Sequence, residues 1–148
     1  HGIGVERDEK KAVALYQKAA GMNLAAAYSA LAQCYRYGAG VSEDKAAAVE
    51  MYTRAFALGQ GGAADEIGTM YLVGNEILPN MREAFRWYEK GAEKEEAASW
   101  YHLGICYAEG LGTEVHRDKA LENLYRAYAA EYPGALEYIT DNMEIRLQ

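Results

Sequence analysis

Apolar side chains recur along this chain at the spacing of an α-helix. In residues 97–109 they are Trp100, Leu103, Gly104 and Tyr107, and the intervals i, i+3, i+4 and i+7 place all four on one side of a helix. The same pattern occurs 36 and 72 residues earlier. It predicts one class of helix, here called A, at residues 25–37, 61–73, 97–109 and 134–146. The small residue at positions 32, 68 and 104 predicts close approach of a neighbouring helix.

A second helical pattern, with a tyrosine between small residues, alternates with the first. Its clearest copy is Ala48, Tyr52 and Ala55, and it predicts B helices at residues 9–22, 45–58, 81–94 and 118–131. Short polar side chains that accept a backbone N–H stand at the expected starts of these helices. They are Asp8, Asp44 and Asn80.

The expected ends of the B helices differ in how well they suit a helix terminus. Asn23 and Gly59 occupy equivalent positions, and both residue types tolerate the left-handed conformation that ends many helices. Glu95 and Glu131 occupy the same position in later copies. We therefore expect those two helix ends to be less sharply defined.

Residue types recur with a period of 36, as in Tyr35, Tyr71 and Tyr107. A unit of this length cannot bury its apolar face alone, so it must stack on its neighbours. The pattern predicts an all-α, right-handed superhelix (solenoid) of helical hairpins. The predicted units are a partial repeat at 1–24, repeats at 25–60, 61–96 and 97–132, and a C-terminal capping helix at 133–148 with Pro133 in its first turn.

The first residues indicate that the chain begins within a repeat. Residues 1–5, HGIGV, parallel residues 37–41, YGAGV, which form the expected loop between an A and a B helix. We therefore expect a loop before Asp8 and a segment of a longer protein. The apolar side of helix 9–22 then lacks its A partner, which favours weak self-association through this end.

Charge and cysteine content narrow the classes of partner and compartment. The formal net charge of −7 argues against a nucleic acid or an anionic membrane as the main partner, and no apolar run is long enough to span a bilayer. Cys34 and Cys106 lie two repeats apart, which places them about 20 Å from each other, beyond disulfide reach. We expect both to be small buried residues, and unpaired thiols favour a reducing, cytoplasmic compartment.

The repeats resemble a known family. Residues 25–57 are similar to a Sel1-like repeat, a longer relative of the tetratricopeptide repeat, with a small-residue A helix, a GxGV loop, an Asp before an Ala, and a Tyr-containing B helix. The matching residues are Leu31, Tyr35, Gly38, Gly40, Val41, Asp44, Ala48, Tyr52 and Ala55. Residues 2–19 match the second half of another copy. Later copies depart from the pattern, since Thr113 replaces the loop Val and residues 75–80, NEILPN, replace the second loop.

The resemblance implies a non-enzymatic scaffold or adaptor for protein–protein interactions. In tetratricopeptide folds the A helices line a concave groove that holds a peptide or protein partner. The positions implied here are Ser29, Gln33, Arg36, Tyr37, Asp65, Thr69, Leu72, Tyr101, Ile105, Glu109, Glu137, Asp141 and Glu144. The acidic C-terminal end favours a basic or polar peptide, and tyrosine is a common binding anchor. The alternative is a structural spacer or regulatory region that supports another domain.

One cluster invites a chemical interpretation. His102, Cys106 and Glu109 share one side of a helix, as a zinc site or a thiol–base pair would require. No further residues with metal-ligand spacing accompany them, and Cys34 and Met70 occupy the same column as Cys106. We therefore expect a packing role, no metal and no cofactor. A metal- or thiol-dependent enzyme remains an alternative that rests on this cluster alone.

Overall fold

The computed structural model describes residues 2–74 and 79–143, without the side chains of residues 2, 3 and 6. All regular structure in these ranges is helical, and the predicted all-α class is confirmed. A-type helices (α2, α4, α6, α8) alternate with B-type helices (α1, α3, α5, α7). The helices are α1 (Gly2–Gly21), α2 (Ala25–Tyr37), α3 (Lys45–Ala57), α4 (Gly62–Val73), α5 (Met81–Glu93), α6 (Ala97–Glu109), α7 (Arg117–Ala129) and α8 (Ala135–Asn142).

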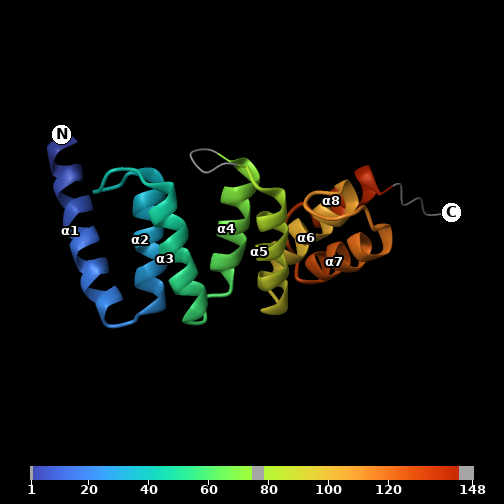
Figure 1. Ribbon diagram of the computed structural model, residues 1–148, viewed down its shortest axis with the longest axis horizontal. Helices are drawn as coiled ribbons and strands as arrows, with labels where there is room; N and C mark the ends of the chain where they lie inside the picture. Colours follow the sequence, from blue (N-terminus) through green and yellow to red (C-terminus); the bar gives the residue numbers. More distant parts are fainter. Residues whose placement is uncertain (1, 75–78, 144–148) are drawn as a thin grey trace.

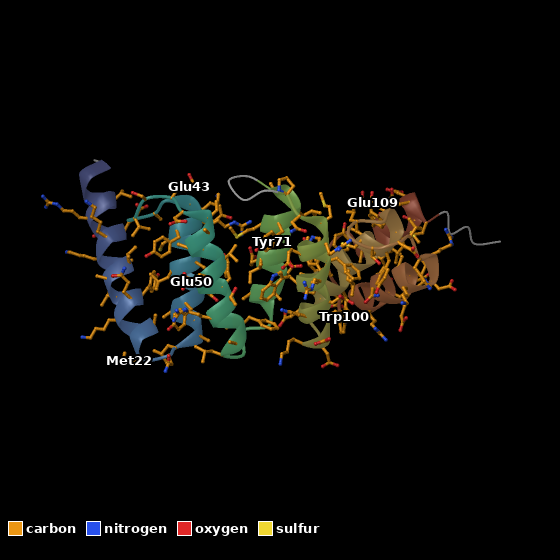
Figure 2. All side chains as sticks on the ribbon, viewed as in Figure 1. Met22, Glu43, Glu50, Tyr71, Trp100 and Glu109 are labelled. Atoms are coloured by element: carbon orange, nitrogen blue, oxygen red, sulfur yellow. The ribbon has the colours of Figure 1, made fainter. Side chains whose placement is uncertain are left out.

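The helices lie in chain order along the long axis of the molecule, with the two termini at opposite ends (Figure 1). Helices α2, α4 and α6 each pair with the B helix that follows, and each B helix also contacts the next A helix. The loop after α2 and the turn after α1 lie at opposite edges of the row, as Glu43 and Met22 show (Figure 2). This arrangement is a solenoid, in which each hairpin is covered only by its neighbours.

Small residues on the A helices let the B helices pack closely, as predicted. Tyr88 is fully buried, and a Cβ added to Gly68 would lie 2.6 Å from its Cε1 atom. In the next hairpin a Cβ on Gly104 would lie 2.7 Å from Cγ of Leu124, which is also fully buried. Contacts this short do not occur, so the absence of a side chain sets the distance between the two helices.

Two of the predicted helix caps are confirmed. Asp44 Oδ1 accepts a hydrogen bond from the Ala47 amide at 3.0 Å, and Asn80 Oδ1 accepts one from the Glu83 amide at 3.0 Å. Each bond satisfies one of the backbone donors that a helix start leaves without a partner. The starts of α3 and α5 therefore follow from local sequence.

A different residue type caps the last B helix. α7 begins at Arg117, which places Asp118 inside its first turn. The cap is His116, whose Nδ1 accepts from the Lys119 amide at 3.2 Å. A neutral imidazole nitrogen accepts the same donor as a carboxylate, so the cap keeps the 36-residue register although the residue type changes.

The loop predicted before Asp8 is also wrong, because α1 is helical from Gly2 onward and Asp8 lies within it. In the equivalent loop, a Cβ on Gly40 would lie 2.6 Å from the backbone carbon of Glu9 on the preceding B helix. Gly4 has no such support, since no atom lies within 4 Å of its added Cβ. Among the described residues no other helix packs against this segment, which continues the helical hydrogen bonding of α1.

All four B-to-A turns have the same conformation, which contradicts the expected difference between them. Asn23, Gly59, Glu95 and Glu131 have φ values of 58°, 104°, 59° and 59°. The bonds that close the two glutamate turns are Glu96 N to Gly91 O at 3.2 Å and Tyr132 N to Ala127 O at 3.0 Å. This is the hydrogen bond of a Schellman helix end. Packing of successive hairpins fixes the turn, and the glutamates adopt its strained backbone.

We expect Glu95→Gly to raise the free energy of unfolding by about 1 kcal/mol, because glycine adopts positive φ without steric cost. Glu131→Gly should have a similar effect. Urea denaturation followed by circular dichroism measures both. As a control, Glu89→Gly inside α5 should lose about 1 kcal/mol through helix propensity. Equal losses for all three variants would contradict the proposed strain.

The last A helix is shorter than predicted within the described residues. α8 begins at Ala135 behind Gly134, so Pro133 precedes the helix and does not lie in its first turn. Ala135, Ile139 and Met143 are buried, and the last two pack in one cluster with residues of α7. The helix was predicted for residues 134–146. Residues 144–148 lie outside the described residues.

Candidate interaction surfaces

The side chains predicted to bind a partner lie on the A helices and form what we call the A-helix face. They divide into exposed and engaged groups. The exposed members are Gln33, Tyr37, Glu109, Glu137 and Asp141. Tyr37 is 68% exposed, which makes it the most exposed aromatic side chain on this face. Glu144 lies outside the described residues.

Side-chain contacts between neighbouring repeats engage two other members. The Arg36 guanidinium lies 2.6 Å from a Glu66 carboxylate oxygen, which joins α2 to α4. Asp65 Oδ1 lies 2.7 Å from His102 Nδ1, which joins α4 to α6. Both side chains therefore fix the angle between successive hairpins. Replacing Arg36 or Asp65 would disturb the solenoid as well as any ligand.

Hydrogen bonds engage Ser29 and Thr69. Ser29 Oγ donates to Gln60 Oε1 at 3.1 Å, and Thr69 Oγ1 lies 3.0 Å from the Tyr88 hydroxyl. The polar atoms of these two residues, like those of Arg36 and Asp65, therefore serve contacts within the protein. Leu72 and Ile105, the apolar members, are partly buried against core clusters and contribute to packing in the same way.

Tyr101 lies within an aromatic cluster that sequence patterns did not indicate. Its ring centroid is 4.9 Å from that of Tyr132 and 6.2 Å from that of Tyr138. His102 is stacked on Tyr88 at 5.0 Å and contacts Tyr101 edge-on at 5.3 Å. Burial raises the pKa of Tyr138 to about 12, and the nearby Glu109 carboxylate adds to the shift. The Tyr138 side chain therefore stays a neutral hydrogen-bonding group at physiological pH.

The C-terminal end of the A-helix face is acidic and unpaired. Glu109, Glu137 and Asp141 are exposed, and none of them forms an ion pair within the described ranges. Glu109 and Tyr138 line a pocket of about 340 Å³ between α6 and α8. Glu109 and Trp100 lie near opposite ends of α6 (Figure 2).

The cluster of His102, Cys106 and Glu109 does not form a reactive site. Cys106 is 1% exposed, and burial, followed by the charge of Glu109, raises its pKa to about 12. Such a thiol keeps its proton near neutral pH, which disfavours its action as a nucleophile. His102 is bound to Asp65 instead, and the described residues contain no group of three His, Cys, Asp or Glu side chains arranged to hold a metal ion. Cys34 and Cys106 are both buried free thiols, as predicted.

The repeated geometry has a counterpart in known families. A model of the Sel1 repeat matches residues 1–24, 25–60, 62–96 and 97–132. The chain belongs to the Sel1 repeat family. Sel1 repeats are generally scaffolds for protein–protein interactions and are typically non-catalytic. No curated protein sequence matches the chain.

Solved structures show the same solenoid. A Sel1 repeat protein from Oxalobacter formigenes is 28% identical with a TM-score of 0.83, over 88% of this chain and 53% of that one. A protective antigen of uropathogenic Escherichia coli strains, which displays an SLR fold, is 28% identical with a TM-score of 0.77, over 84% and 27% of the two chains. Helicobacter pylori cysteine-rich protein B shares the fold at 20% identity and a TM-score of 0.70, over 90% and 96%. The chain thus spans about half of the Oxalobacter protein.

Membrane insertion has no support in the helices. Within residues 2–74 and 79–143, none of them combines the length and apolarity that a bilayer crossing requires. The longest, α1, extends over 20 residues but carries charged side chains along its length.

Proposed function

We propose that this chain is a non-enzymatic interaction scaffold that binds a basic or polar segment of a partner protein on the A-helix face. The observation that carries the proposal is the unpaired acidic end of that face. Glu109, Glu137 and Asp141 are exposed carboxylates without a cationic partner in the described part of the chain. Elsewhere on the face the charged side chains of Arg36 and Asp65 are satisfied within the protein.

The neighbouring tyrosines supply the apolar component of such a site. Tyr101, Tyr132 and Tyr138 form a cluster held by ring contacts, so their positions are fixed before a partner arrives. Rigid aromatic side chains contribute contact area at a low entropy cost. Carboxylates around them attract a cationic segment, accelerate its association and exclude acidic competitors. Together they favour a partner segment with basic or polar side chains.

We expect short random peptides selected for binding to this protein to be enriched in Lys and Arg. The combined variant Glu109→Gln, Glu137→Gln and Asp141→Asn should weaken their binding about tenfold or more, because it removes the charges that face the peptide. Fluorescence anisotropy of a labelled selected peptide measures the dissociation constant. Binding should also weaken as the salt concentration rises.

The matched control removes the same charge from other surfaces. Asp8→Asn, Glu95→Gln and Asp118→Asn change exposed carboxylates outside the A-helix face. This variant should keep at least about half of the affinity, because carboxylates outside the site act on the peptide only through long-range attraction, which salt screens. Equal losses in both variants would mean that net charge, and not this site, attracts the peptides. Selection of acidic or purely apolar peptides would also contradict the proposal.

A further inference from the structure

We propose a second interaction surface on the opposite, B-helix side of the solenoid, in the groove between α5 and α7. Its occupant is an arginine side chain of a partner protein. The groove has a volume of about 390 Å³ and is floored by Trp100, Leu103 and Tyr107 of α6. Glu89 and Glu93 of α5 form one wall. This surface uses none of the residues of the A-helix face, so either proposal stands without the other.

We call the contact between two successive B helices a joint. The groove exists because two large side chains that fill the preceding joint, between α3 and α5, have no counterpart between α5 and α7. Between α3 and α5, the rings of Phe56 and Trp87 pack edge-on with centroids 5.8 Å apart. The residues 36 positions later are Ala92 and Asn123, and both line the groove between α5 and α7. Asn123 is 7% exposed, and its Nδ2 donates to the Lys119 carbonyl at 2.9 Å. The same fold thus fills one joint and leaves the next one open.

The Trp100 ring in the floor of the groove has no cation over it. Trp100 occupies the column of Tyr28, and in that first joint Arg54 lies over the tyrosine ring at 5.9 Å. Arg126, the counterpart of Arg54, pairs with Glu122 at 2.8 Å, as Arg54 pairs with Glu50 at 3.2 Å, but it does not lie over the Trp100 ring. Within the described residues no lysine or arginine lies over the Trp100 ring. An incoming guanidinium would take the position that the chain fills with its own arginine elsewhere.

The wall of the groove supplies the complementary charge. Glu89 and Glu93 lie one helical turn apart, and neither forms an ion pair within the described ranges. Burial raises the pKa of Glu89, and the neighbouring Glu93 charge raises it further. Lys119, the nearest cation on the other side, lies over the Tyr107 ring at 5.5 Å. The two carboxylates therefore remain available to a cation from outside.

Arginine suits this combination better than other basic groups. Its flat guanidinium stacks on an indole ring while its N–H donors form paired bonds to carboxylates, which a lysine ammonium cannot do in one plane. A cavity of this size accommodates one long side chain, and not a folded element. The chemistry of floor and wall therefore points to a single arginine presented on a partner segment.

The test follows the indole N–H signals of the two tryptophans by NMR during titration with the blocked tripeptide Ac-Gly-Arg-Gly-NH2. We expect the Trp100 signal to shift with a dissociation constant on the order of millimolar, as for one stacked ion pair. The Trp87 signal, already covered by Phe56 and Lys90, should stay in place. The lysine tripeptide should bind several-fold more weakly, and the neutral citrulline tripeptide should not shift Trp100.

Two variants make the result decisive. Ala92→Phe with Asn123→Trp copies the filled joint and should abolish the Trp100 shift while the chain stays folded. Glu89→Gln with Glu93→Gln should weaken binding about tenfold. Asp8→Asn with Glu95→Gln removes the same charge elsewhere and should leave binding within about twofold. The proposal is overturned if citrulline binds as well as arginine, if both tryptophans shift alike, or if the filled variant still binds.

Discussion

Gly112→Ala is expected to lower the free energy of unfolding by about 3 kcal/mol, as the sum of backbone strain and overpacking. Gly112 has a φ of 72°, which costs an alanine steric energy that glycine does not incur. An added Cβ would also lie 2.6 Å from the carbonyl carbon of Met81 and 2.9 Å from Cβ of Phe85. Both belong to α5, so the loop of one repeat rests directly on the B helix of the repeat before it. Urea denaturation followed by tryptophan fluorescence measures the loss.

A second glycine separates the two causes. Gly38 has the same φ of 72°, but the nearest atom to its added Cβ is Cβ of Glu43 at an ordinary 3.4 Å. Gly38→Ala should therefore cost only the backbone term, about 1 kcal/mol. Hydrogen exchange in α7 and α8 should quicken in Gly112→Ala, because the contact that joins them to α5 is weakened. Equal losses at Gly38 and Gly112 would show that the contact with α5 contributes nothing.

Periodicity predicted the helices well because each one depends on its own apolar stripe. The A helix at 97–109 and the caps Asp44 and Asn80 were recognisable from local residues alone. The same argument failed where a neighbour decides the conformation. Glu95 adopts a left-handed backbone because the next hairpin requires that turn, and residues before Asp8 are helical because nothing supports a loop there.

The candidate surfaces were only partly predictable for a related reason. Helical spacing identified side chains off the packing stripe, and Gln33 and Tyr37 are indeed exposed. It did not show that Asp65 meets His102, because that contact depends on the offset between successive A helices. A comparison of equivalent columns contains part of this information. It reveals that Asn123 stands at the position equivalent to Trp87. That this change opens a groove follows only once the residues that face Asn123 are known.

The same columns predict strong coupling where α5 meets α6. Gly91 faces Ser99, and a Cβ on Gly91 would lie 2.7 Å from the serine Cβ and still closer to its Oγ. At the equivalent contacts of the preceding and following repeats, both residues are alanine, at positions 55 and 63 and at positions 127 and 135. The contact between α5 and α6 thus combines a residue smaller than alanine, Gly91, with a larger one, Ser99. The pair also lies beside Trp100 and sets how closely α6 approaches α5 there.

We expect Gly91→Ala alone to cost about 2 kcal/mol, although alanine favours a helix, because overpacking outweighs propensity. Ser99→Ala alone should be neutral or stabilising by about 1 kcal/mol, since the Ser99 hydroxyl is fully buried and has no hydrogen-bond partner among the described residues. The double variant reproduces the alanine pairs of the neighbouring repeats and should be at least as stable as the original chain. A double-mutant cycle from urea denaturation should therefore give a coupling energy of about 1.5 kcal/mol or more. Additive effects would show that the two positions do not compensate for each other.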